Sequence, residues 1–293
     1  MIYLYGMIMS TYSFMLKYGF PEIDGTGIID KKYHLLGGET GTSAAVLKSL
    51  GADVKVGGTH LGNENKNVIL KGLEGVDTTE LVYEDYDGVV DYVFISGDTR
   101  TCFGEWENVF SRQTPFYEPP SEQSVKSANV IGADPFFGSE VARLAGKYSK
   151  PYATIDCPHD SEMNRYCEIN AVSHQYLKGT YPDVSFEELH RKYTDNTDGL
   201  VIFTRGSDEV LYGRKNQEIK SFKPFSVNAV STLGAGDCFK AGTIYALDKG
   251  MSDDEIVRFA CAVSAAAITK FPIPINPPTL DEVLNLINNN PKG

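Results

Sequence analysis

The sequence is poor in positive charge. Its 293 residues include 27 lysines and arginines against 39 aspartates and glutamates, which gives a formal net charge of −12 at pH 7. Nucleic acid and anionic membranes would repel such a chain at long range, so the charge argues against both as main partners. A small phosphate ligand remains allowed, because backbone N–H groups can hold it in a local pocket.

Paired cysteines and long apolar runs are also missing. The five cysteines are scattered, odd in number and without a CxxC pair. They are typical of reduced cytosolic thiols rather than of a disulfide framework or a zinc site. The apolar residues 1–16 lack a basic leader region and are too short to span a bilayer. We therefore expect a buried first strand over 2–9 and a cytoplasmic protein.

Internal repeats, Pro/Ser-rich linkers and blocks of one charge are absent as well, so we expect one domain over residues 1–293. Apolar runs of strand length alternate with runs of helix length. This rhythm predicts an α/β fold, with a mostly parallel central sheet covered by helices on both faces. The clearest predicted strands lie within 128–136, 152–158, 168–173 and 199–206.

Two stretches interrupt this rhythm, 26–36 and 88–103, where polar residues break up the apolar ones. They fit a small antiparallel β extension standing off the main sheet. A helix is predicted over 42–50. S/T-x-x-E capping boxes predict three further helix starts, at Ser185, Ser252 and Thr279.

The stretch STLGAGDCFKAG, residues 231–242, places a turn of small residues directly before a carboxylate. Residues 225–231 are predicted to be a strand and 238–248 a helix, so the turn lies at a helix N-terminus. The first N–H groups of a helix lack partners and attract anions, and small residues let a phosphoryl group approach them. Asp237 on this turn could take a proton from an attacking hydroxyl. On the residues alone, a charge that merely stabilises the helix explains Asp237 equally well.

The same stretch closely resembles DTxGAGDxFxAG, a signature of the ribokinase-like (PfkB) carbohydrate kinases. The resemblance implies a ribokinase-like fold with a β lid formed by roughly 12–35 and 86–104. It also implies transfer of the γ-phosphoryl group of ATP, with Mg²⁺, to a hydroxyl of a small sugar or sugar-like substrate. Four more segments resemble motifs of that family in the same order: 37–51, 153–158, 199–213 and 259–269.

The resemblance also implies roles for individual residues. Asp237 would be the catalytic base, and the N–H groups of Gly234, Ala235 and Gly236 would form the anion hole. No residue is expected to bind the metal directly.

Nucleotide contacts are implied for Thr204 and Gly206, with Ser264 beside the adenine. The lid would close over the substrate and exclude water. In several relatives the lid also pairs between subunits, which makes a homodimer through the lid a further expectation.

The substrate-holding residues depart from the family pattern. They are expected at Thr11, Gly37, Gly38, Thr42 and Arg100, but Thr11 stands where the family usually has an aspartate that grips sugar hydroxyls. Thr42 stands where the family has an asparagine. A hydroxyl cannot accept the charge-assisted hydrogen bonds of a carboxylate.

Other family positions are altered too. Residues 62–64 read Gly-Asn-Glu where Gly-Asp-Asp is usual, and the metal-related NxxE motif is missing, with Ser173 and Tyr176 at its Asn and Glu positions. Some ketose and fructosamine kinases of this superfamily resemble the chain here, so a ketose or fructosamine type of substrate is favoured. The alternatives are a nucleoside kinase, a kinase acting on a sugar phosphate, or a nucleotide-binding protein whose sugar kinase activity is lost or altered.

Several polar residues could compensate for these departures. The hydroxyls of Ser10 and Ser13 could join those of the two threonines in holding a polyol. Glu39 or Asp24 could supply a replacement carboxylate, although both also read as ordinary turn or surface charges. Lys240 could approach a phosphate or face solvent from its helix.

Overall fold

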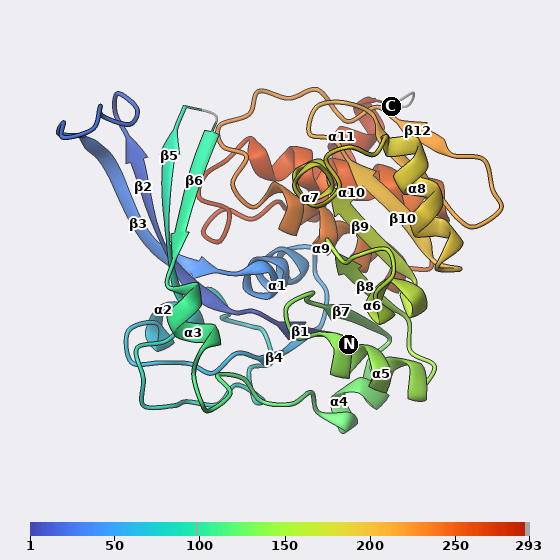
Figure 1. The fold of residues 1–293 in the computed structure, drawn as a ribbon, viewed down its shortest axis with the longest axis horizontal. Coiled ribbons are helices and arrows are strands. Elements are labelled where there is room, and N and C mark those ends of the chain that lie inside the picture. The colour runs from blue at the N-terminus through green and yellow to red at the C-terminus, as the bar shows by residue number, and fades with distance from the viewer. Residues whose placement is uncertain (98, 291–293) are drawn as a thin grey trace.

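The central sheet of the molecule is mostly parallel, as the sequence predicts. The structure is a computed structural model that describes residues 1–97 and 99–290. Within this part of the chain the strand order is β12-β11-β10-β9-β8-β7-β1-β4; all neighbours from β10 to β4 run parallel, and β11 and β12 are antiparallel (Figure 1). The strands are β1 (Ile2–Gly6), β4 (Val54–Gly58), β7 (Val130–Ala133), β8 (Tyr152–Ile155), β9 (Ile169–Ser173), β10 (Leu200–Thr204), β11 (Val210–Gly213) and β12 (Lys220–Phe222).

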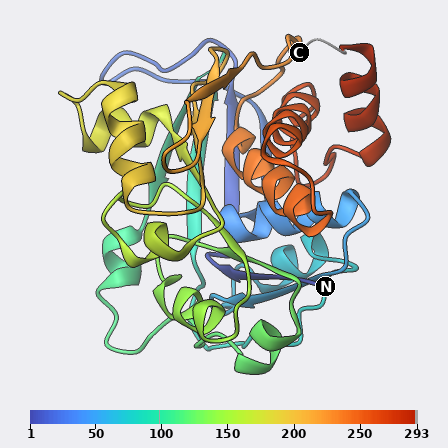
Figure 2. The ribbon, with the colours of Figure 1, turned by 90° about the vertical axis from the view of Figure 1, so that its right-hand side faces the viewer.

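Helices cover both faces of this sheet (Figure 2). Alternate strand residues are buried on opposite sides, Ile202 in the core beneath one helix layer and Phe203 in the core beneath the other. This explains why the strands read as nearly continuous apolar runs. One layer comprises α1 (Glu39–Ser49), α9 (Ala235–Asp248), α10 (Asp253–Ile268) and α11 (Leu280–Asn289), and the other α4 (Glu122–Ser127), α5 (Ser139–Lys147), α6 (Glu162–Tyr166), α7 (His174–Thr180) and α8 (Phe186–Asp195).

A second sheet projects from the main body, at the upper left of Figure 1. Its strand order is β3-β2-β5-β6, with two antiparallel hairpins joined by a parallel pairing of β2 and β5. The predicted β extension therefore exists, but it is not purely antiparallel as predicted, because β2 and β5 pair in parallel. Its strands are β2 (Met9–Leu16), β3 (Ile29–Gly37), β5 (Val90–Ser96) and β6 (Thr99–Gly104), and the short helices α2 (Lys66–Gly72) and α3 (Trp106–Phe110) lie near its base.

The predicted buried first strand is confirmed over Ile2–Gly6, but its extension to residue 9 is wrong, because the chain changes sheets there. β1 ends at Gly6, where a Cβ would lie 2.1 Å from the Cβ of Asp134. The next two backbone N–H groups bond to side chains instead of a neighbouring strand. Met7 N donates to Asp134 Oδ2 at 2.9 Å, and Ile8 N donates to Thr59 Oγ1 at 2.9 Å. These contacts take the chain out of the central sheet and into β2.

The predicted strand over 225–231 is also wrong. This segment pairs with no strand among the described residues, and its end is held by a helix terminus. The N–H groups of Val230 and Ser231 donate to the carbonyl oxygen of Ile268, at 2.7 and 3.4 Å. The apolar character of the segment reflects packing beside α10 rather than membership of a sheet.

The predicted helix starts are confirmed, with shifts in their bounds. Ser252 and Thr279 form capping boxes at α10 and α11, and the Ser185 hydroxyl accepts from the N–H of Glu188 at 3.2 Å. The helix predicted over 42–50 begins earlier, after Gly38, and the one predicted over 238–248 begins at Ala235.

Candidate active site

The turn before α9 has the geometry that its glycines suggest. Gly234 is the N-cap of α9 with φ of +79°, in the left-handed region that glycine adopts without strain. A Cβ there would lie only 3.1 Å from the Cδ1 of Ile273. The turn therefore needs glycine for its backbone angle, and a larger residue would also have to displace the end of the Ile273 side chain by a few tenths of an ångström.

The open N–H groups of this turn are not all the expected ones. The N–H of Ala235 donates to the carbonyl oxygen of Thr232 at 3.2 Å, so this group of the predicted anion hole is already engaged. The N–H groups of Gly236 and Asp237 fall in the first turn of α9, and no backbone acceptor engages them within the described residues. The anion hole predicted at 234–236 stays a prediction, in which the N–H of Ala235 is already engaged.

Asp237 carries a strongly perturbed carboxyl group at this end of the helix. Its pKa is raised to about 7, mainly by burial and also by the negative charges of Asp134 and Asp156, against the opposing charges of Lys240 and Arg100. The residue keeps part of its surface exposed. A carboxyl with a pKa near neutrality can both take up and release a proton at pH 7.

Lys240 neither reaches a phosphate nor faces solvent, in contrast to both expectations. Its side chain is only 1% exposed, and its ammonium group forms an ion pair with Glu39. It also donates to the carbonyl oxygen of Ala133 at 3.2 Å. Burial opposes its charge, but the charges of Glu39 and Asp134 outweigh burial and raise the pKa of Lys240. Glu39 is therefore committed to this buried pair.

The carboxyl ends of the neighbouring strands lie beside this network. Thr204 ends β10 and pairs with Ser173, which ends β9, and Gly206 follows with φ of +67°. Ser173 holds Asp156 through two hydrogen bonds, from its N–H at 2.7 Å and from its hydroxyl at 3.1 Å. In parallel sheets ligands bind at this edge, so Thr204 and Gly206 are suitably placed for a ligand.

Ser264 connects α10 to the glycine turn. Its hydroxyl donates to the carbonyl oxygen of Ala235 at 3.0 Å. The side chain thus fixes the start of α9, and the predicted contact with an adenine remains a prediction.

The predicted substrate residues meet where the second sheet joins α1. Gly37 and Gly38 are close to other parts of the chain, since a Cβ would lie 2.0 Å from Thr11 Oγ1 or 2.6 Å from the Met7 carbonyl oxygen, respectively. Thr42 is buried, and its methyl group would lie 3.7 Å from a Cβ on Gly234. The structure therefore brings these residues to the turn that carries Asp237.

Two acidic residues that sequence reasoning left without a role belong to this region. Asp134 follows β7 and accepts from the N–H groups of Met7 and Phe136, both at 2.9 Å. Asp91 lies on β5, directly opposite Thr11. A carboxylate directly after a buried strand is a signal that could have identified Asp134, whereas the position of Asp91 depends on strand register.

Neither a metal cluster nor a membrane span is found in the described part of the chain. No three His, Cys, Asp or Glu residues there could together hold a metal ion. No helix in residues 1–97 or 99–290 combines the length and apolar character needed to cross a bilayer.

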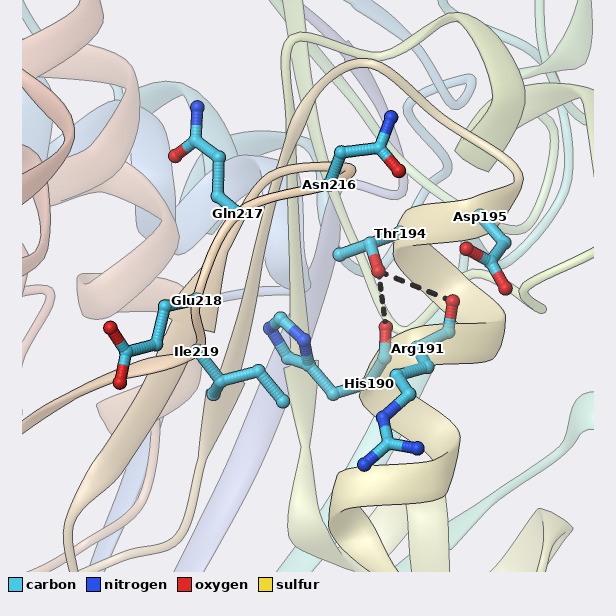
Figure 3. A pocket seen from close by; sticks show the side chains of 8 residues that line it. All are labelled: His190, Arg191, Thr194, Asp195, Asn216, Gln217, Glu218 and Ile219. Atoms are coloured by element: carbon cyan, nitrogen blue, oxygen red, sulfur yellow. Dashed lines mark hydrogen bonds between the residues drawn. The ribbon is translucent and has the colours of Figure 1, made fainter.

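A separate pocket of about 460 Å³ lies between α8 and the loop 216–219 (Figure 3). Its buried His190 donates through Nε2 to the carbonyl oxygen of Val201 at 3.2 Å. Val201 is near the start of β10, whereas Thr204 marks its end. This pocket therefore lies at the amino ends of the parallel strands, whereas Asp237 lies at their carboxyl ends.

Comparisons with known proteins agree with this geometry. Residues 150–273 match the model of the pfkB family carbohydrate kinases. The chain is 25% identical to the ribokinase of Haemophilus influenzae over 284 residues, which covers 90% of this chain and 91% of that protein. It is 31% identical to the 1-phosphofructokinase of Vibrio cholerae over 137 residues, 46% of this chain, and there it spans only 39% of the relative's length.

The fold is shared with solved ribokinase structures. The structure of Arabidopsis thaliana ribokinase complexed with ribose and ATP superposes with a TM-score of 0.80 at 17% identity, covering 98% of each chain. The matched segment 150–273 includes the glycine turn, Asp237 and the end of β10. The chain thus resembles the pfkB family carbohydrate kinases over residues 150–273, and it shares the fold of solved ribokinase structures over nearly its whole length.

Proposed function

We propose that this protein transfers the γ-phosphoryl group of ATP to a hydroxyl of a small sugar or sugar-like substrate, with ketoses or fructosamines favoured. The observation that carries the proposal is Asp237, whose pKa is about 7 at the start of α9, next to the open N–H groups of Gly236 and Asp237 itself. A base and an anion-binding helix end on one turn are what phosphoryl transfer to an alcohol requires.

In this mechanism Asp237 takes the proton of the attacking hydroxyl. The N-terminus of α9 holds the oxygens of the transferred group through the N–H groups of Gly236 and Asp237. Since burial raises the pKa of Asp237, its carboxylate is a stronger base than an exposed aspartate and still ionised in part at pH 7. Lys240 and Glu39 do not touch substrate but fix the helix below the base.

ATP and Mg²⁺ fit the oxygen-rich character of the site. Burial raises the pKa of both Asp156 and Asp237, and the charge of Asp156 adds to the rise at Asp237, so a cation would relieve this repulsion. Hard cations such as Mg²⁺ prefer carboxylate and water oxygens. When bound, ATP supplies the phosphoryl group and Mg²⁺ neutralises phosphate charge. Asp156 and Asp237 would hold the ion through water, while Thr204, Gly206 and Ser264 would contact the nucleotide.

We propose that the second sheet is the substrate lid and that two copies pair through it. Its outer face carries stacked aromatic rings, with ring centroids 5.6 Å apart for Tyr12 and Tyr92 and 5.0 Å apart for Phe14 and Phe94. Phe103 on the same sheet is 52% exposed. An apolar face of this kind favours a partner surface. The free thiols of all five cysteines support a reducing compartment such as the cytoplasm.

The test is a phosphoryl-transfer screen with ATP and Mg²⁺ against ketoses, fructosamines, nucleosides and sugar phosphates. Product is detected by mass spectrometry, and the Asp237→Asn variant serves as the control. We expect phosphorylation of a ketose or fructosamine by the unsubstituted protein and at most a trace by the variant. ATP binding without transfer to any acceptor would contradict the proposal and favour a nucleotide-binding protein, the alternative that Thr11, Thr42 and the missing NxxE motif support.

A further inference from the structure

Asp91 has a carboxylate oxygen without a partner. The residue lies on β5 directly opposite Thr11 of β2, and directly opposed residues of paired strands point to the same face of a sheet. Asp91 Oδ1 is buried and has no hydrogen-bond partner among the described residues. Buried polar atoms are nearly always paired, so this oxygen indicates a donor that comes from outside the chain.

The face that carries Asp91 looks toward α9. Tyr33 of β3 lies on this face, two residues from the partner of Thr11, and its ring packs edge-on against Phe271 beyond the end of α10, with centroids 5.5 Å apart. Arg100 of β6 shares the same face, and its positive charge partly offsets the effect of burial on the pKa of Asp237. The carboxylate of Asp91 therefore faces the space in front of the proposed base.

The carboxylates expected to replace the missing aspartate are engaged or distant. Glu39 is paired with the buried Lys240. Asp24 is exposed on the turn between β2 and β3, at the far end of the second sheet from its junction with α1 (Figure 1). Asp91, by contrast, stands across one strand pairing from Thr11, the position where the family pattern has its sugar-gripping aspartate.

We propose that Asp91 determines substrate specificity by accepting hydrogen bonds from the hydroxyls of a polyol, with the Thr11 hydroxyl beside it. This inference rests on the proposed function and narrows its substrate class to sugars that present free adjacent hydroxyls to the lid. Burial raises the pKa of Asp91 to about 6, although its hydrogen bond with Thr11 opposes the rise. The group is thus mostly ionised above pH 7, the form that accepts from two hydroxyls at once.

The test measures sugar binding by calorimetry in the Asp237→Asn background, where turnover does not interfere. It compares Asp91→Asn with Asp30→Asn, a matched control on the exposed end of β3. The titrants are a panel of ketoses and fructosamines, with deoxy analogues of whichever sugar binds. We expect Asp91→Asn to weaken sugar binding about 10- to 100-fold, the worth of hydrogen bonds to a charged group, and to leave ATP affinity within about twofold.

Two further comparisons separate a substrate contact from a structural effect. A deoxy analogue that lacks the contacted hydroxyl should bind the Asp237→Asn protein weakly. Its affinity should fall little further when Asp91 is also replaced, because the hydroxyl that Asp91 would contact is already missing. The exchange variant, Thr11→Asp with Asp91→Thr, should recover about tenfold or more of the lost affinity, because the carboxylate returns to the paired strand.

The outcomes distinguish the two proposals. Unchanged sugar affinity in Asp91→Asn, with a native circular dichroism spectrum, overturns the inference and leaves the proposed function standing. Sugar binding without any phosphorylation by the unsubstituted protein overturns the proposed function alone. Absence of binding by every sugar of the panel overturns both.

Discussion

The start of α9 and the inner face of the second sheet contribute to one candidate site in opposite ways. At α9 the proposed base and the proposed anion-binding N–H groups are neighbours in the sequence, all within residues 234–237. On the second sheet, Thr11 of β2 and Asp91 of β5 come together only through strand pairing, and Arg100 of β6 lies further along the same face, opposite Ile95. The first arrangement is set by one helix turn, and the second by the register of three strands.

This difference shows why the chemistry and the specificity of such a protein can change independently. The α9 turn cannot move Asp237 without losing the helix end beside it. A sheet can exchange a carboxylate between directly opposed positions, because both side chains point to the same face. Residues that hold a substrate can thus differ from a family pattern while the residues that carry the reaction do not.

The largest expected effect separates the two regions by their kinetics. Asp237→Asn should lower kcat by about 10²–10⁴-fold, the usual contribution of a positioned general base, with little change in the KM of the sugar. Asp91→Asn should instead act mainly on that KM. Steady-state kinetics of both variants checks this. A similar loss of kcat in both variants would contradict the assignment of the reaction to α9 and of sugar binding to the second sheet.

Next in size is the effect of Lys240→Met on stability. Removing the ammonium leaves the buried carboxylate of Glu39 without its partner, so we expect a loss of about 3–5 kcal/mol in the free energy of unfolding. The double variant with Glu39→Gln should recover part of this loss. Urea unfolding measures the free energy of unfolding of both variants. If Lys240→Met were as stable as the unsubstituted protein, the ion pair would not stabilise α9.

The pH dependence should follow Asp237. Its pKa of about 7 in the folded protein means that kcat, measured at saturating sugar, should fall about tenfold for each pH unit below neutrality, since the base must be ionised. A flat profile between pH 5 and 8, at saturating ATP, would exclude this carboxyl as the base.

Stability should change with pH in the opposite sense. Because the carboxyl of Asp237 has a higher pKa folded than unfolded, the folded state binds more protons between about pH 4 and 7, and stability falls as pH rises through this window. Asp237→Asn should therefore raise Tm at pH 8 and have little effect near pH 4. Calorimetry at both values checks the sign.

The smallest effect is expected for Arg100→Ala. Arg100 is exposed, and its charge only offsets part of the rise in the pKa of Asp237. Its removal should move the acidic limb of the pH profile upward by a few tenths of a unit and raise KM a few-fold, and high salt should reduce both changes. If the acidic limb of the profile did not move, the charge of Arg100 would have no influence on the pKa of Asp237, which would contradict this prediction.

The sequence predicted the parts of the molecule that depend on local interactions. The parallel sheet, the helix caps at Ser252 and Thr279 and the glycine turn at 234 all follow from short-range patterns. It failed at 225–231, where apolar residues pack beside a helix end, and at the end of 2–9, where side chains of Asp134 and Thr59 redirect the backbone.

The candidate site divides in the same way. Asp237 could be identified from its motif, but the commitment of Lys240 to Glu39 spans 201 positions of the sequence. The pairing of Asp91 with Thr11 likewise depends on which strands become neighbours. Neither periodicity nor composition carries that information, because both describe one segment at a time.

Two junctions of the second sheet with the main body, Met7–Ile8 before β2 and Gly37–Gly38 after β3, are tied to each other. The N–H of Thr40 donates to the Met7 carbonyl oxygen at 3.1 Å, and Met7 N is in turn held by Asp134, beside the carbonyl that Lys240 contacts. The start of β2 and the start of α1 therefore share one set of contacts, and the buried charges of Asp134 and Lys240 lie at this junction.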